Sequence, residues 1–157
     1  MDTDAELRFD QGDATPERLK RQIQRLTGMT SAQMGKVSGG ALADVGARKD
    51  HYVVLAALAE LGPASQSQLS DRTRVYRSDL VAVLNELEGA GLIRRDPDPA
   101  DKRRNVITIT GPGGKRLAEL DAVLEGVNER ILAPLSGAER RELFRLLGVV
   151  NAHLASG

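Results

Sequence analysis

The sequence predicts a mainly helical fold with one small β-hairpin, an α+β arrangement. Apolar residues recur at helical spacing through most of the 157 residues, which indicates that helices dominate. Two short runs, 92–95 and 105–110, predict the strands of a hairpin, and in the second Val106, Thr108 and Thr110 alternate with Ile107 and Ile109. Strong helix breakers lie at Gly62 with Pro63 and again at Gly89 with Gly91. The helices between these two points must therefore be short.

The composition excludes several classes of function. The chain has no cysteine, which rules out disulfides, thiolate zinc sites and iron–sulfur clusters. The longest apolar run, Tyr52 to Ala59, is too short to cross a membrane, and the N-terminus is acidic, unlike a signal region. We therefore expect a cytoplasmic protein without a membrane partner. Because no catalytic, metal or cofactor motif occurs, we also expect no enzyme activity, metal or cofactor.

The N-terminal part divides into a tail and a helical region. Residues 1–14 are acidic and lack apolar periodicity, which predicts a flexible tail. Thr15 suits a helix N-cap and Pro16 the first helical position, so a helix is expected to begin there and to carry Leu19 and Ile23 on one face.

The central part predicts three helices in quick succession. Residues 50–61 form a mostly buried helix, and Ser65 with Gln68 has the spacing of a capping box that starts a helix of about two turns. From Ser78 the apolar pattern restarts and predicts a helix with two faces. Its apolar stripe, Leu80, Val83, Leu84 and Leu87, is expected to face the core, and the opposite face carries Ser78, Val81, Ala82 and Asn85.

The C-terminal part predicts the hairpin, a long loop and two more helices. The loop, 96–104, contains two prolines that stiffen it into a projection. The helices are expected at about 113–131 and 136–155, and Ser136 with Glu139 has capping-box spacing at the start of the second. This last helix has an apolar stripe with nothing left in the domain to cover it. This stripe predicts a second subunit. The expected residues of the interface with this subunit come from the first and the last helix and are Leu19, Ile23, Leu143, Leu147, Val150 and Leu154.

The order helix, short helix, helix, β-ribbon, with long helices on either side, resembles the winged helix-turn-helix of the MarR family. Residues 87–95, LEGAGLIRR, are similar to the family's LExxGLxxR pattern. Residues 101–103, DKR, resemble its wing tip, and Thr110 with Gly113 resembles its TxxG pattern. The resemblance implies one domain over 15–155, with a DNA-binding lobe at about 50–112 and dimerisation helices at about 15–48 and 113–155. Tyr76 departs from the family's usual capping residue, which predicts that the third helix begins at Ser78.

The resemblance further implies a homodimer that binds a palindromic operator in double-stranded DNA. The third helix would enter the major groove and the wing the minor groove, where a narrow groove attracts arginine. The residues expected to read the major groove are Tyr76, Arg77, Ser78, Val81, Ala82 and Asn85; the wing residues are Asp101, Lys102, Arg103 and Arg104; and the candidate phosphate contacts are Ser65, Gln66, Ser67, Arg72, Arg74 and Arg95.

Some roles stay open at the level of sequence. Tyr76 suits either a phosphate contact or packing of the turn, and Arg94 and Arg95 could instead pair with Asp96, Asp98 or Glu88. The segment from Arg72 to Arg104 contains eight basic and six acidic residues, which is a small excess of positive charge. The assignment of DNA contacts therefore rests more on the position of each residue in the fold than on charge.

By resemblance, the chain is expected to be a transcriptional regulator, a repressor released by a small-molecule effector such as an aromatic acid. His51 is the candidate residue of an effector pocket, and a structural role is the alternative for it. The alternative function is a winged-helix protein-interaction module that does not read DNA, which the formal net charge of zero favours.

Overall fold

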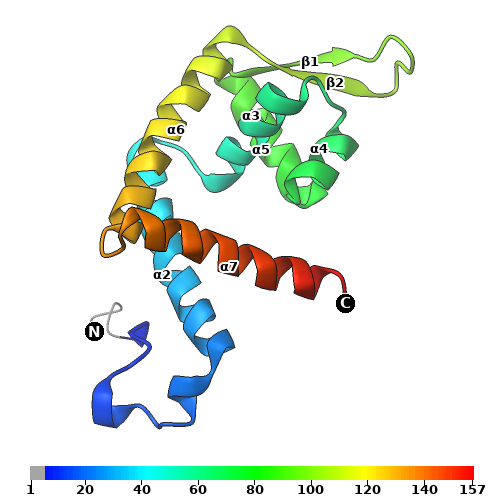
Figure 1. Cartoon of the computed structure of the whole chain (residues 1–157). Helices are drawn as coiled ribbons and strands as arrows, with labels where there is room; N and C mark the ends of the chain where they lie inside the picture. The colour runs from blue at the N-terminus through cyan, green and yellow to red at the C-terminus, as the bar shows by residue number, and fades with distance from the viewer. Residues whose placement is uncertain (1–5) are drawn as a thin grey trace. The chain divides into compact units, whose positions relative to one another are not determined.

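The computed structural model describes residues 6–157, and the chain divides into two compact units. The first unit ends at Leu124 and the second begins at Glu125. Residues 1–5, where the predicted acidic tail begins, lie outside the described residues. Helices and a single antiparallel pair of strands make up the regular structure of the described part, which confirms the predicted fold class (Figure 1).

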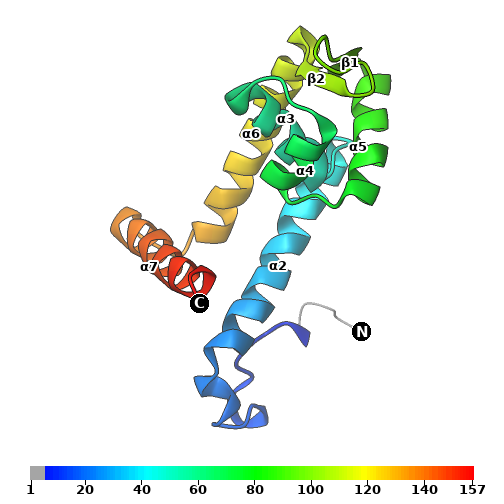
Figure 2. The same cartoon turned by 90° about the vertical axis from the view of Figure 1, so that its right-hand side faces the viewer.

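The regular elements follow the predicted order. In the first unit, α2 extends away from the cluster formed by α3, α4 and α5, as Figure 1 and Figure 2 both show. Two 3-10 turns precede α2, and the β-hairpin leads into α6. The elements are η1 (Gly12–Ala14), η2 (Leu19–Arg21), α2 (Ile23–Asp44), α3 (Lys49–Leu61), α4 (Gln66–Thr73), α5 (Arg77–Gly89), β1 (Ile93–Pro97), β2 (Asn105–Ile109), α6 (Gly111–Leu132) and α7 (Gly137–Ala155).

The first long helix begins later than the sequence predicts. Thr15 does not cap it, because its buried hydroxyl accepts a hydrogen bond from the Gln11 N–H (2.9 Å). The chain then makes the short turn η2, and Gln22 is extended, with φ −94° and ψ 104°, which delays the start of α2 to Ile23. The expected helix start at Thr15 and Pro16 is therefore wrong.

The segment before η1 contacts α2. The Arg25 guanidinium lies 5.2 Å from the centre of the Phe9 ring and also donates to the Phe9 carbonyl oxygen (2.9 Å). About two turns further along α2, the Gln33 amide donates to the Leu7 carbonyl oxygen (2.6 Å). These contacts show where residues 7–9 lie, and the predicted flexibility of the tail stays a prediction.

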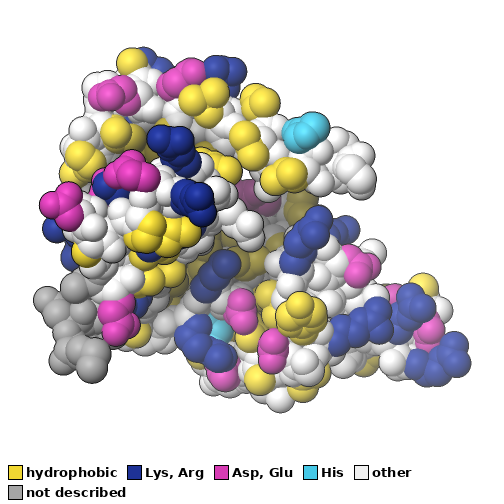
Figure 3. Space-filling view, turned by 90° about the horizontal axis from the view of Figure 1, so that it is seen from below, with side chains coloured by type: hydrophobic (Ala, Val, Ile, Leu, Met, Phe, Trp, Pro, Cys, Tyr) yellow, Lys and Arg dark blue, Asp and Glu magenta, His cyan; other side chains and the backbone are white. Residues whose placement is uncertain are grey.

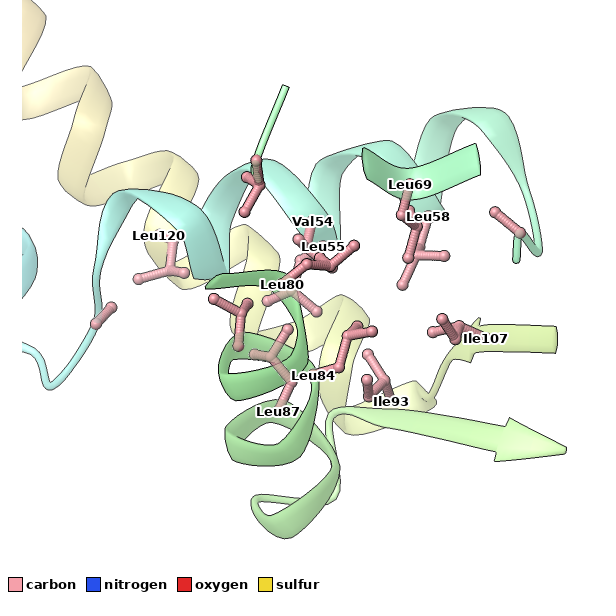
Figure 4. Close-up of a cluster of buried hydrophobic side chains, with 14 of the residues drawn as sticks. Val54, Leu55, Leu58, Leu69, Leu80, Leu84, Leu87, Ile93, Ile107 and Leu120 are labelled. Carbon is pink, nitrogen blue, oxygen red and sulfur yellow. The ribbon is translucent and has the colours of Figure 1, made fainter. Parts of the chain in front are cut away.

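The core of the first unit lies among α3, α4, α5 and the hairpin. The predicted apolar stripe of α5 is confirmed, since its four members are at most 2% exposed. They pack with buried leucines and a valine of α3, with Leu69 of α4 and with Ile93 and Ile107 of the strands (Figure 4). Burial of this stripe on one face leaves the other face of α5 in solvent. The stripe consists of Leu80, Val83, Leu84 and Leu87.

The predicted hairpin is confirmed, and it projects beyond α4 (Figure 1). Its strands pair from Ile93 opposite Ile109 to Pro97 opposite Asn105. Ala64, just before α4, exchanges two backbone hydrogen bonds with Ile107 (3.1 and 2.8 Å), which ties the hairpin to the start of α4.

A hydrogen-bonded junction joins the hairpin to α6. The Thr110 hydroxyl donates to the Gly91 carbonyl oxygen (2.6 Å) and accepts from the Gly113 N–H (3.1 Å). A Cβ atom placed on Gly113 would lie only 2.0 Å from the carbonyl oxygen of Leu92. The backbone of Leu92 therefore leaves room for glycine alone at position 113.

The second unit contains the end of α6 and the whole of α7. The predicted capping box at the start of α7 is confirmed, because the Ser136 hydroxyl accepts from the Glu139 N–H (3.2 Å) and Glu139 accepts from the Ser136 N–H (2.9 Å). Within this unit Arg140 pairs with Glu129 (2.9 Å). Nowhere in residues 6–157 does a helix have the length and apolar character needed to cross a membrane.

Candidate nucleic-acid interface

The short helix α4 is fixed at both ends by its own side chains. The Ser65 hydroxyl accepts from the Gln68 N–H (3.2 Å), and the Gln68 side chain accepts from the Ser65 N–H (2.9 Å), so the predicted capping box is confirmed. At the other end, Arg74 adopts a left-handed conformation (φ 58°) that stops the helix. The Ser70 hydroxyl donates to the Val75 carbonyl oxygen (2.8 Å) and secures the turn into α5.

The helix α5 begins one residue earlier than predicted, at Arg77 instead of Ser78. Tyr76 takes the N-cap position, but its side chain makes no capping hydrogen bond and is 78% exposed. The helix can begin there because an extended residue can precede a helix without a side-chain cap. The Arg77 guanidinium donates to the Ser67 hydroxyl of α4 (3.2 Å). Its charge is thereby held beside the start of α4.

The outward face of α5 is exposed, as the apolar stripe requires. Four residues at helical spacing lie on it, and the largest apolar one, Val81, is 44% exposed. Small and polar side chains on an exposed face allow a helix to lie close to a partner surface. The four residues are Ser78, Val81, Ala82 and Asn85.

In the loop of the hairpin, Asp101 holds Arg103. The carboxylate accepts from Arg103 Nε (3.1 Å) and from the Arg103 backbone N–H (3.1 Å), and Arg104 lies 3.7 Å away. These contacts lower the pKa of Asp101 below its usual range, with the Arg103 guanidinium as the main cause. The Arg103 side chain is nevertheless 91% exposed. The loop therefore presents an oriented, solvated arginine.

A groove of about 630 Å³ lies between the start of α4 and the hairpin loop. It brings together candidate residues that are distant in the sequence, and Figure 3 shows basic side chains gathered on the projecting hairpin. Lys102, Arg72 and Arg74 are not among the residues that line this groove. The candidate residues that line it are Ser65, Gln66, Ser67, Arg77, Arg103 and Arg104.

The two arginines of β1 have acidic partners, as one of the sequence interpretations allowed. Arg94 pairs with Asp96 on the same strand (2.6 Å). Arg95 reaches α5, where it pairs with Glu88 (2.8 Å) and donates to the Asn85 side-chain oxygen (2.8 Å). The pairing raises the pKa of Arg95 and lowers that of Glu88.

A second, smaller pocket of about 300 Å³ contains His51. His51 Nδ1 accepts from the Arg48 N–H (3.2 Å), so Nε2 carries the proton and donates to Glu86 on α5 (2.6 Å). The Arg48 guanidinium also contacts Glu86 (2.6 Å), and His51 followed by Arg48 lowers the pKa of this carboxyl. Most of the remaining lining is apolar, from Leu55, Leu87, Leu92 and Leu120, with Arg116 at one side.

The sequence interpretation did not find the partners of His51. Glu86 stands 35 residues further along the chain, and nothing in the local pattern distinguishes it from an ordinary exposed glutamate. Arg116 lies on α6, where it donates to Glu119 and to the carbonyl oxygen of Val45. Among the described residues, no group of three or more His, Asp or Glu side chains could hold a metal ion.

The comparisons with known proteins agree on one family. The family model of the MarR family matches residues 49–104, from α3 through the hairpin loop. The transcriptional regulator HosA of Escherichia coli O111:H- is 37% identical over 99 residues, which are 63% of this chain and 73% of HosA. The chain belongs to the MarR family. Its relatives are named as transcriptional regulators and not as enzymes.

Solved structures share the fold of this MarR-family chain. BpsR of Bordetella bronchiseptica, in a structure titled for regulation of its DNA binding by 6-hydroxynicotinic acid, superposes with a TM-score of 0.75 at 23% identity, over 87% of this chain and 98% of BpsR. A mutant MarR of E. coli complexed with operator DNA gives a TM-score of 0.70 at 20% identity, over 82% and 92% of the two chains. At these identities the likeness concerns the fold.

The predicted dimer residues of this MarR-family chain are largely exposed. Ile23 is 71% exposed, Val150 54% and Leu154 72%, whereas Leu143 is half-buried. The apolar surface of α7 is wider than predicted, since Phe144 (67%) and Val149 (57%) are exposed as well. The remaining predicted residues, Leu19 and Leu147, are 39% and 48% exposed.

Proposed function

We propose that this MarR-family chain is a homodimeric repressor that binds a palindromic operator in double-stranded DNA and is released by a small-molecule effector. The observation that carries the proposal is the placement of Arg103. It is oriented by Asp101 at the end of the projecting hairpin and lines the same groove as Arg77 and the start of α4. Basic and polar groups thus converge from the wing and from both helices of the helix-turn-helix.

Each part of this surface suits one part of a DNA duplex. The exposed face of α5 carries side chains that are small or polar, so the helix can lie close to the floor of the major groove. In that groove each base pair has its own pattern of donors and acceptors. The hydroxyl and amide side chains at the start of α4 suit phosphate oxygens. An oriented arginine at the wing suits a narrow minor groove of strong negative potential. The operator complex of E. coli MarR supports duplex DNA as the partner.

The homodimer is supported by the exposed apolar residues of α2 and α7. Single exposed apolar side chains are ordinary, but a row of them at helical spacing along α7 is typical of an interface (Figure 3). A dimer with a twofold axis would place two copies of α5 on two half-sites, which accounts for a palindromic operator.

The effector is proposed to bind in the pocket that contains His51. A largely apolar pocket with an imidazole and a guanidinium at its sides suits a flat aromatic ring that carries a carboxylate. Regulation of BpsR by 6-hydroxynicotinic acid, an aromatic acid, supports this class of ligand. The pocket includes Glu86 and Leu87 of α5, so a ligand there would touch the helix that is proposed to read DNA.

The test of the proposed function is selection of bound duplexes from a random pool by the full-length protein. We expect enrichment of one inverted repeat whose half-site centres lie about one helical turn apart. Failure to enrich any sequence, with binding to other proteins instead, would support the alternative of a protein-interaction module.

Arg103→Ala is expected to weaken binding to the selected operator about tenfold at physiological salt, and most at sites with A·T-rich flanks. In a dimer two wings are lost, so the salt dependence should become shallower by about two phosphate equivalents. Fluorescence anisotropy with labelled duplex at several salt concentrations measures both effects. Arg130→Ala, which removes an exposed arginine of α6, is the control and should bind normally. Unchanged affinity and salt slope in Arg103→Ala would exclude the wing contact.

His51→Ala is expected to weaken binding of 6-hydroxynicotinic acid by about tenfold, because the imidazole ring lines one side of the pocket and its contact with the aromatic ring of the ligand is lost. Operator binding in the absence of the acid should stay close to wild type. Calorimetry measures ligand binding, and a gel-shift assay with increasing acid measures release. His153→Ala, which changes an exposed histidine of α7, is the control. Release of His51→Ala at the same acid concentration as wild type would contradict the pocket assignment.

A further inference from the structure

Asn85 lies on the exposed face of α5, and its side-chain oxygen is already hydrogen-bonded within the protein. It follows Ser78, Val81 and Ala82 at helical spacing, so it shares the face that is proposed to enter the major groove. Its side-chain oxygen accepts a hydrogen bond from a terminal guanidinium nitrogen of Arg95 (2.8 Å). Arg95 belongs to β1, outside the helix-turn-helix.

The guanidinium of Arg95 is itself held in place by Glu88. The guanidinium donates from Nε (3.1 Å) and from a terminal nitrogen (2.8 Å) to the two carboxylate oxygens of Glu88, in a bidentate pair. The Arg95 side chain is only 24% exposed. Bidentate arginine–carboxylate pairs fix the plane of the guanidinium, so its remaining N–H groups have a defined direction.

This contact determines the orientation of the Asn85 amide. A guanidinium has only donors, so the Asn85 atom that faces Arg95 must be the carbonyl oxygen. The NH₂ group then points in another direction, away from Arg95. Asn85 therefore presents donors to a partner, while its acceptor is directed at β1.

An asparagine that reads adenine needs both of its groups, because it donates to N7 and accepts from the N6 amino group. Guanine presents two acceptors, O6 and N7, at the same edge and needs only donors. We propose that Arg95 is a positioning residue that makes Asn85 select guanine over adenine at one base pair of each half-site. The proposal rests on the proposed function, since it assumes that α5 reads DNA.

The test compares base preferences after selection from a random duplex pool by four full-length proteins. These are wild type, Asn85→Ala, Arg95→Met and Arg94→Ala. Asn85→Ala identifies the base pair that Asn85 reads, as the one position at which preference is lost. Arg95→Met keeps an unbranched stem but cannot donate, so the Asn85 amide becomes free to turn. Arg94→Ala is the matched control, because Arg94 pairs with Asp96 on its own strand.

We expect guanine at this base pair for wild type and for Arg94→Ala. For Arg95→Met we expect the ratio of adenine to guanine to rise about tenfold, with the other positions unchanged. A merely structural role of Arg95 would weaken binding at all positions without this shift. Thermal unfolding of each variant, followed by circular dichroism, verifies that the compared proteins are folded.

Three results would overturn the inference while the proposed function stands. They are adenine at this base pair for wild type, an unchanged preference in Arg95→Met, and no loss of preference anywhere in Asn85→Ala. If wild type enriches no sequence at all, the proposed function fails first and the inference with it.

Discussion

Replacing Gly113 by alanine is expected to lower the free energy of unfolding by about 3 kcal/mol, at the upper end of the usual cost of overpacking. The added Cβ would lie 2.0 Å from the Leu92 carbonyl oxygen and 2.8 Å from the Ile109 side chain. The first contact is with backbone, so it can be relieved only by moving the end of the hairpin or the start of α6. That movement would also break the hydrogen bond from Gly113 to Thr110.

Urea unfolding of Gly113→Ala and wild type measures this effect. Gly114→Ala is the matched control, because nothing lies within 4 Å of a Cβ at that neighbouring position. In the control, alanine should raise the free energy of unfolding by up to about 1 kcal/mol through its higher helix propensity. Equal stability of the two variants would show that the junction is not as tight as the structure has it.

Charging Leu147 is expected to convert the protein from a dimer to a monomer. In Leu147→Asp a carboxylate would be buried without a partner in the proposed interface, at a cost of several kcal/mol. Operator binding should fall steeply as well, because one half-site contact is weak without the second. Sedimentation velocity at micromolar concentration measures the oligomeric state.

The control for Leu147→Asp is Ala152→Asp, which adds the same charge to α7 on the face opposite the apolar row. It should remain a dimer. A wild-type protein that sediments as a folded monomer, or a Leu147→Asp variant that stays dimeric, would contradict the proposed interface.

The sequence predicted those parts of the fold that depend on local periodicity and capping. The stripe from Leu80 to Leu87 and the capping boxes at Ser65 and Ser136 were confirmed, because such patterns are complete within one helix. The start of α2 was predicted wrongly, because the Thr15 hydroxyl bonds to Gln11 and Gln22 is extended. A threonine followed by a proline is compatible with a helix start and also with the turn that the structure shows, so the local sequence does not decide between them.

The candidate sites were predictable only in part. Asp101 beside Arg103 could be read from the loop, since both residues lie within one short turn. The contact of His51 with Glu86 and that of Arg95 with Asn85 join different elements, and their sequence separation hides them. Sequence patterns name the residues of such a site, but tertiary structure decides which way each donor and acceptor points.

The most direct test of the central proposal is a titration of the wild-type protein with the selected duplex and with a shuffled duplex of the same composition, over a range of salt concentrations. If the chain reads DNA through α5 and the wing, the selected duplex should bind about a thousandfold or more tightly than the shuffled one. Its affinity should also fall steeply as salt rises, because phosphate contacts release counterions. Equal affinity for the two duplexes, or no binding to either at low salt, would contradict the proposal.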